Sequence, residues 1–110
     1  MSKTNKERAV EVETLNRQMG WYDGDRDFGM EIALLHSEVS EMLEAYRQYG
    51  LATTQREKDG KPLDVSSEAA DLFIRLLDFC KRYNIDLDYE YERKMVFNRT
   101  RPYRHGDKLA

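Results

Sequence analysis

The sequence predicts an all-α protein with a single domain over residues 1–110. Charged residues make up 35% of the chain and hydrophobic residues 40%, a balance that favours well-solvated helices over a sheet. Two long segments, 28–49 and 66–83, repeat apolar residues at alternating spacings of four and three, the period of a helix packed along its length. A chain of this size buries one modest core. We therefore expect four helices, with the second and third at the centre.

The first predicted helix covers residues 3–19, where apolar residues recur every three or four positions, and Gly20 ends it. The second helix covers residues 28–49 and stops at Gly50. Its apolar positions form an unbroken stripe of Phe28, Ile32, Leu35, Val39, Met42, Tyr46 and Tyr49. This stripe predicts the face that packs against the rest of the protein, with the acidic residues of the helix on its flank.

Residues 50–65 form a long polar connection, which we expect to be either functional or disordered. Within it, Asp59-Gly60 is a turn signal, and Pro62 keeps the next helix from starting early.

The third predicted helix, 66–83, is apolar on nearly every side, so we place it at the centre of its assembly. Its only polar strip consists of Glu68, Asp71, Arg75 and Asp78, which must be paired, hydrogen-bonded or metal-bound if they are buried. A fourth helix is expected over residues 87–99, with Asp86 as its N-cap and Pro102 beyond its end.

The bulk properties exclude several classes of protein. A formal charge of −3 gives no electrostatic reason to expect nucleic acid as the main partner. The single cysteine, Cys80, lies in an apolar helical run and is expected to be a buried free thiol. The chain shows neither a leader sequence nor an apolar run long enough for a membrane span. We expect a soluble, cytoplasmic protein with no membrane partner.

Two aromatic residues, Trp21 and Tyr22, open the polar loop between the first two helices. Aromatic side chains in such a loop either plug the end of a helical bundle or stack on a planar ligand such as a nucleobase. The sequence leaves both interpretations open for Trp21.

Two pairs of carboxylates form the candidate site. Glu38 and Glu41 on the second helix, and Glu68 and Asp71 on the third, are each three residues apart, so each pair lies on one side of its helix. Four carboxylates on two packed helices make an oxygen site that suits Mg²⁺, with Mn²⁺ as a possible substitute, better than Zn²⁺. A solvated helix face is the ordinary explanation for the first pair. The second pair interrupts an apolar helix, where unpaired charge is costly.

The order of these motifs resembles a known signature. Glu-x-x-Glu followed by Glu-x-x-Asp is similar to the pattern of the all-α nucleoside triphosphate pyrophosphohydrolases, the MazG-like group. Segments 34–41 and 68–78 resemble the two metal-binding helices of that family. Segment 94–103 is similar to the Lys…Asn…Arg stretch that ends its dCTP pyrophosphatase-like members. The resemblance covers roughly residues 20–105.

The resemblance implies hydrolysis of a nucleoside triphosphate between the α and β phosphates, giving a monophosphate and pyrophosphate. It implies that the four acids are the catalytic residues and the Mg²⁺ ligands: Glu38, Glu41, Glu68 and Asp71. It implies a second group that binds the substrate, namely Lys94, Asn98 and Arg101 at the phosphates and Trp21 at the base. It also implies a homodimer or homotetramer that completes a four-helix bundle and has sites built between chains.

Three alternatives to a nucleotide pyrophosphohydrolase can be compared with the sequence. A di-iron centre is excluded, because neither His36 nor His105 follows a Glu by three positions. A catalytically silent adaptor that binds a nucleotide or a protein is the second alternative, because Ser37 stands where some dimeric relatives have an additional Glu. The third is a small nucleic-acid-binding bundle, which the negative net charge disfavours. It would use four basic residues near the C-terminus: Arg99, Arg101, Arg104 and Lys108.

Overall fold

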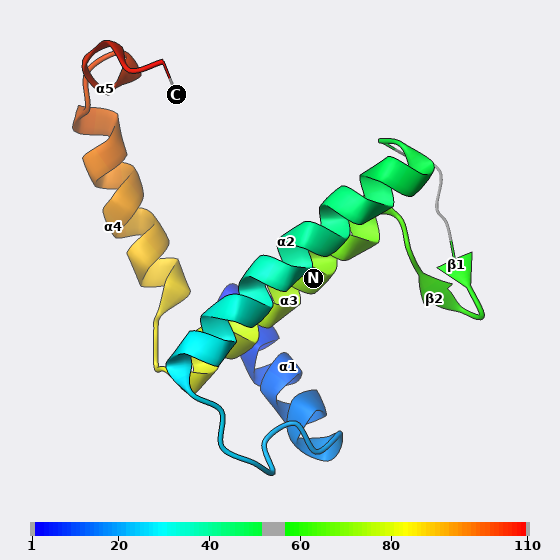
Figure 1. Ribbon diagram of the computed structural model, residues 1–110. Helices are drawn as coiled ribbons and strands as arrows, with labels where there is room; N and C mark the ends of the chain where they lie inside the picture. The colour runs from blue at the N-terminus through cyan, green and yellow to red at the C-terminus, as the bar shows by residue number, and fades with distance from the viewer. Residues whose placement is uncertain (1, 52–56, 110) are drawn as a thin grey trace.

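The computed structural model of the chain describes residues 2–51 and 57–109. The elements are α1 (Asn5–Gln18), α2 (Phe28–Tyr49), β1 (Glu57–Lys58), β2 (Lys61–Pro62), α3 (Val65–Arg82), α4 (Leu87–Thr100) and α5 (Arg104–Asp107) (Figure 1). The all-α fold and the four predicted helices are confirmed, and each helix end lies within two residues of its expected place. Within the described part of the chain, no helix is long and apolar enough to cross a membrane.

Each of the four long helices begins at a side chain that accepts a hydrogen bond from the backbone of the first turn. These N-caps are Thr4, Asp27, Asp64 and Asp86. The predicted cap at Asp86 is confirmed, since its Oδ1 accepts from the Tyr89 backbone at 3.1 Å. A side-chain acceptor at the N-cap satisfies a backbone donor that the helix itself cannot. Local sequence therefore fixes where each helix starts.

Helix α3 lies at the centre, with α1 and α2 both packed against it. The buried apolar residues come from all three helices: Val12, Ala45, Leu77, Phe79 and Cys80. The expectation that Cys80 is a buried free thiol is confirmed. The expectation that α2 shares the centre is wrong, because α2 has α3 on one side and a largely exposed surface on the other.

The face of α2 that contacts α3 is not the stripe that the sequence predicts. The fully buried positions of α2 are Glu31, Glu38 and Ala45, which are seven residues apart and lie along one edge of the apolar stripe. At the opposite edge, Val39 and Tyr46 are exposed, and Leu43 continues this exposed row. The apolar surface of α2 is therefore wider than α3 alone can cover.

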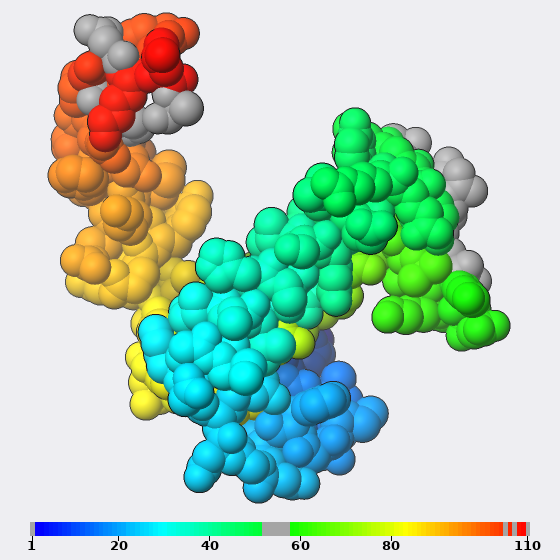
Figure 2. All heavy atoms as spheres, in the orientation of Figure 1, coloured from blue at the N-terminus to red at the C-terminus, as the bar shows by residue number. Residues whose placement is uncertain are grey.

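Helix α4 stands away from the α1–α3 body. It contacts the start of α1, where Asn5 Nδ2 donates to Asp88 Oδ1 at 2.9 Å, and none of its described residues is buried. Figure 2 shows α4 and α5 as a separate arm at the upper left. The radius of gyration is 16.8 Å, against about 13 Å for a compact chain of this length. The chain by itself does not close a four-helix bundle.

The 50–65 connection contains structure that the sequence did not predict. Strands β1 and β2 form a small antiparallel hairpin, in which Lys58 pairs with Lys61. The Asp59-Gly60 turn signal is confirmed, since both residues have a positive φ, of 54° and 81°, as the tightest hairpin turns require. Residues 52–56 of the predicted loop lie outside the described residues. Helix α5 is a further addition to the predicted elements.

Candidate metal centre and adjoining groove

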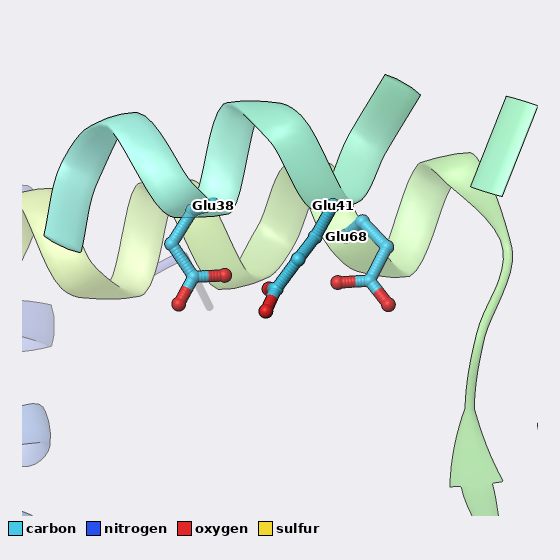
Figure 3. Close-up of side chains that lie close together, drawn as sticks. All are labelled: Glu38, Glu41 and Glu68. Carbon is cyan, nitrogen blue, oxygen red and sulfur yellow. The ribbon is translucent and has the colours of Figure 1, made fainter. Parts of the chain in front are cut away.

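Three of the four predicted acids converge between α2 and α3. One carboxylate oxygen from each of Glu38, Glu41 and Glu68 lies within 4.8 Å of the other two. Figure 3 shows the three side chains pointing to the same side of the helix pair, with the carboxylate of Glu41 between the others. The i, i+3 spacing on α2 and the packing of α3 beside it produce this arrangement. These three residues are called the acid cluster below.

The acid cluster is electrostatically strained in the absence of a cation. Interaction with the neighbouring Glu38 carboxyl, followed by burial and the negative charges of Glu38 and Glu68, raises the pKa of Glu41. Burial, followed by the neighbouring Asp71 carboxyl, raises the pKa of Glu68. The positive charge of Lys61 on β2 opposes both shifts without cancelling them. Like charges held this close disfavour ionisation of all of them.

Glu38 has an oxygen that lacks a partner. The residue is 8% exposed, and its buried Oε2 accepts no hydrogen bond from any donor among the described residues. A buried carboxylate oxygen without a donor is costly, so such an atom points to a ligand that the protein itself does not supply. The all-oxygen donor set of the acid cluster fits Mg²⁺ or Mn²⁺.

Asp71, the fourth predicted acid, is exposed and lies outside the acid cluster. It contacts Glu68, since a hydrogen bond between the two side chains contributes to the raised pKa of Glu68. Asp71 therefore sits at the edge of the candidate metal centre, where it can meet a ligand from the solvent side.

The other oxygen of Glu38 is held by Arg75. The Arg75 Nε donates to Glu38 Oε1 at 3.0 Å and links α3 to α2 beside the acid cluster. Because Arg75 follows Asp71 by four residues and Glu68 by seven, all three lie on one side of α3. The sequence had identified Arg75 only as part of a polar strip that needed partners.

A groove with a volume of about 380 Å³ adjoins the acid cluster. It runs between the loop after α1 and the helices α2 and α3, and its wall includes Trp21, Glu38, Asp71 and Arg75. Trp21 is 60% exposed, so it does not plug the bundle within this chain. Trp21 lines the groove, and its contact with a ligand there stays a prediction.

A buried ion-pair network holds the far end of the groove. Asp78, which is 4% exposed, accepts hydrogen bonds from Arg82 Nε at 2.7 Å, from the Tyr22 hydroxyl at 2.7 Å and from Asn16 Nδ2 at 3.1 Å. Arg82 also donates to the Trp21 carbonyl oxygen at 3.1 Å. Although burial raises the pKa of Asp78, these hydrogen bonds outweigh it, and the net shift is downward. The network fixes the Trp21 loop to α3.

A second buried acid of α2 belongs to the same network. Glu31 is 1% exposed and lies 3.2 Å from Arg26 and 4.0 Å from Arg82. The sequence predicts that Glu31 lies on the flank of the α2 stripe, but its ion pairs with the two arginines were not predicted. The spacing does indicate burial of Glu31 beside Glu38, because the two residues are seven positions apart and so share one face of the helix.

The predicted phosphate-binding residues are not brought to the acids within one chain. Lys94, Asn98 and Arg101 lie along α4 or directly after it, and Figure 1 shows α4 leading away from the α2–α3 pair. The side chains of Lys94 and Arg101 both lie near the Phe97 ring, each 5.7 Å from its centroid. A contact with the acid cluster would have to come from another copy of the chain.

Comparison with protein-family models, with curated proteins and with solved structures gives no match for this chain. The functional argument therefore rests on the site itself.

Proposed function

We propose that the protein is a Mg²⁺-dependent nucleoside triphosphate pyrophosphohydrolase, with Mn²⁺ as a possible substitute, that cleaves its substrate between the α and β phosphates. The observation that carries this proposal is the convergence of Glu38, Glu41 and Glu68 from two helices, together with the buried Oε2 of Glu38 that has no donor among the described residues. The order of acidic motifs, which resembles the MazG-like group, supports the same activity.

Glu38, Glu41 and Glu68 would hold the metal, and Asp71 at the edge would complete the ligand set. A bound Mg²⁺ supplies charge neutralisation of phosphate oxygens and lowers the pKa of a bound water. The proton acceptor would be a carboxylate oxygen of the site that does not bind the metal. Hydrolysis adds a water oxygen to phosphorus, breaks the α–β phosphoanhydride bond and passes the water proton to such a carboxylate.

We also propose a homodimer or homotetramer in which α4 of one subunit approaches the acid cluster of another. The accessible surface of the chain is 8894 Å², whereas a compact monomer of this mass exposes about 6,400 Å². The excess, roughly 2,500 Å², is of the size that permanent homodimers bury. The exposed row of Val39, Leu43 and Tyr46 on α2 is one surface available to a second copy.

The isolated position of α4 supports the same assembly. A helix of this length is marginal in water without a partner, and α4 exposes Tyr89, Tyr91, Val96 and Phe97. A second copy that covers these side chains would also carry Lys94, Asn98 and Arg101 toward an acidic site that needs positive charge to accept a triphosphate.

The test is a panel of nucleoside and deoxynucleoside triphosphates with Mg²⁺, assayed for release of pyrophosphate. We expect turnover of at least one member of the panel, and a large loss of turnover in Asp71→Asn. The Glu44→Gln variant is the matched control, because Glu44 is an exposed acid on α2 whose ion-pair partner among the described residues is the surface residue Arg47. Turnover of no nucleotide, or equal turnover by Asp71→Asn, would remove the enzymatic proposal.

One observation favours a second candidate, a catalytically silent adaptor that binds a nucleotide or a protein. Ser37, at the position of an additional acid in some relatives, donates its hydroxyl to the Leu34 carbonyl oxygen at 2.7 Å and so faces its own helix. Calorimetry separates the two candidates, since an adaptor binds a nucleotide without releasing pyrophosphate.

A further inference from the structure

The electrostatic balance of the candidate metal centre demands a cation that has not yet been assigned. Four ionised carboxylates, Glu38, Glu41, Glu68 and Asp71, carry two more charges than one divalent ion can neutralise. A triphosphate adds several more negative charges, and close unscreened repulsion between like charges is severe. The basic residues of α4 lie far along the arm of the same chain. The groove beside the acid cluster is a source of positive charge within the same chain, in addition to the α4 residues that a second copy would bring.

Three arginines line the groove: Arg26, Arg75 and Arg82. Arg82 is engaged in the buried Asp78 network. It donates to Asp78 and to the Trp21 carbonyl oxygen, and it lies 3.8 Å from the centroid of the Tyr22 ring. Arg26 pairs with Glu31, two helical turns before Glu38 and therefore about 10 Å along α2 from the acid cluster. Neither is placed to meet a ligand of the acid cluster.

Arg75 differs from both. It is the groove arginine that touches the acid cluster, and it does so through Nε alone. Its terminal Nη1 and Nη2 atoms donate no hydrogen bond to any acceptor among residues 2–51 and 57–109. Its side chain is 30% exposed, more than that of Arg26 or Arg82. A guanidinium fork that is fixed at one end and open at the other is preorganised to take an oxyanion.

We propose that Arg75 is a substrate-binding residue, whose Nε orients Glu38 while its Nη atoms bind a phosphoryl oxygen of the triphosphate held at the acid cluster. The inference rests on the proposed function, because it assumes a polyphosphate at that site. The positively charged group in the groove is then Arg75 on α3 of the same chain, and Lys94 and Arg101 would come from a second copy.

The test is calorimetric binding of two probes that are not turned over by the proposed cleavage step: α,β-methylene-dCTP with Mg²⁺, and Mn²⁺ alone. Arg75→Gln should weaken binding of the nucleotide analogue roughly 10- to 100-fold, the effect expected for loss of a charge-assisted hydrogen bond. The affinity for Mn²⁺ alone should stay equal or rise, because a cation that competes for Glu38 is gone. Inorganic triphosphate with Mg²⁺ serves as a probe that is independent of the base.

Arg75→Lys keeps the charge but loses the fork, so its affinity for the analogue should fall between those of the wild type and Arg75→Gln. Arg47→Gln removes an exposed arginine of α2 that pairs with Glu44 on the surface, and this variant should bind all probes like the wild type. Thermal unfolding of each variant reports whether it is folded, and the conservative lysine variant covers the case in which glutamine is not tolerated.

Two results would overturn the inference. If the affinities for Mn²⁺ and for the triphosphate probes fall by the same factor, Arg75 merely supports Glu38. If the triphosphate affinities do not change, Arg75 does not meet the substrate. Failure of the proposed function is recognised separately, as a wild-type protein that releases no pyrophosphate from any nucleotide. A wild type that releases pyrophosphate but binds neither triphosphate probe overturns the role of Arg75.

Discussion

The Tyr22 hydroxyl donates a 2.7 Å hydrogen bond to Oδ1 of the buried Asp78, and this contact fastens the loop after α1 to the central helix α3. Asp78 also pairs with Arg82 at 2.7 Å. Arg82 lies over the Tyr22 ring, with its guanidinium carbon 3.8 Å from the ring centroid. The loop that carries Trp21 is thus held by charge rather than by apolar packing.

Removal of Asp78 should be the most destabilising change in this network. Asp78→Ala leaves the largely buried Arg82 without its main partner, so we expect a loss of about 3–5 kcal/mol in the free energy of unfolding. Tyr22→Phe removes one hydrogen bond and should cost about 1 kcal/mol. Glu90→Ala, which breaks the exposed pair with Arg93, should cost less than about 1 kcal/mol. Urea titrations at pH 7 measure all three, and an Asp78→Ala effect as small as that of Glu90→Ala would contradict the role of the network.

The pH dependence of the Asp78 effect has a defined sign. Because the pKa of Asp78 is lowered in the folded state, its contribution to stability is present above the ordinary aspartate pKa near 4 and is lost as the pH falls through the lowered value. The difference between wild type and Asp78→Asn should therefore be full at pH 6–7 and shrink steadily below pH 4.

The acid cluster should behave in the opposite way. The pKa of Glu41 is raised in the folded state, so its contribution is most favourable below the ordinary glutamate pKa and is lost as the pH rises through the raised value. Glu41→Gln should then increase the melting temperature of the metal-free protein at pH 7, with little difference at pH 4. Mg²⁺ should stabilise the wild type and have a much smaller effect on the variant. Glu44→Gln is the control, and a melting temperature lowered by Glu41→Gln would contradict the strain inferred in the cluster.

The helices and their ends could be predicted because their signals are local. Caps such as Asp86, terminators such as Gly50 and apolar spacing act within a few residues, so they hold whatever the helices pack against. The convergence of Glu38 with Glu68 was predicted in the same way, since a fixed spacing puts an acid on a known side of each helix.

The contact face of α2 could not be predicted, because it depends on where α3 lies. The apolar stripe through Val39 and the row through Glu38 lie side by side on α2, and the period alone favours the more apolar one. The buried Glu31 is paired with Arg26 of the preceding loop and with Arg82 of α3, and Arg82 is distant in sequence. The direction of α4 likewise depends on the turn at Asn84, where φ is positive at 56°, and not on any pattern in the helix.

The exposed row on α2 predicts self-association. We expect light scattering coupled to size-exclusion chromatography to give the mass of a dimer or tetramer for the wild type, and a shift toward the 13.1 kDa monomer for Leu43→Asp. The reason is that a charge buried at an apolar interface is costly. Gln48→Asp introduces the same charge on another side of α2 and should leave the mass unchanged. A wild type that is monomeric at micromolar concentration would contradict the assembly.

If α4 acts on the partner's site, two inactive variants should complement each other. Glu68→Gln damages the acid cluster, and Lys94→Ala damages the arm. Random mixing of the two in a dimer gives one intact site in each heterodimer, and so about a quarter of the wild-type activity per subunit. If α4 acts within its own chain, no heterodimer has an intact site and the mixture stays inactive. Refolding the variants separately and together provides the comparison.

Trp21 allows occupancy of the groove to be observed directly, because it is the single tryptophan of the chain. Its side chain is 60% exposed and lines the groove beside Glu38 and Asp71, where a nucleobase could stack on it while the phosphates reach the acid cluster. We expect its fluorescence to change on addition of α,β-methylene-dCTP with Mg²⁺, but not of inorganic triphosphate. Trp21→Leu should weaken binding of the nucleotide analogue about 10- to 100-fold, the range measured for loss of base stacking.

Binding of inorganic triphosphate should not change in Trp21→Leu, because that probe has no base to stack. Equal losses of affinity for the analogue and for inorganic triphosphate would show that Trp21 supports the fold of the loop rather than the base. The two probes thus separate the nucleoside end of the groove from its phosphate end, where Arg75 and the acid cluster lie.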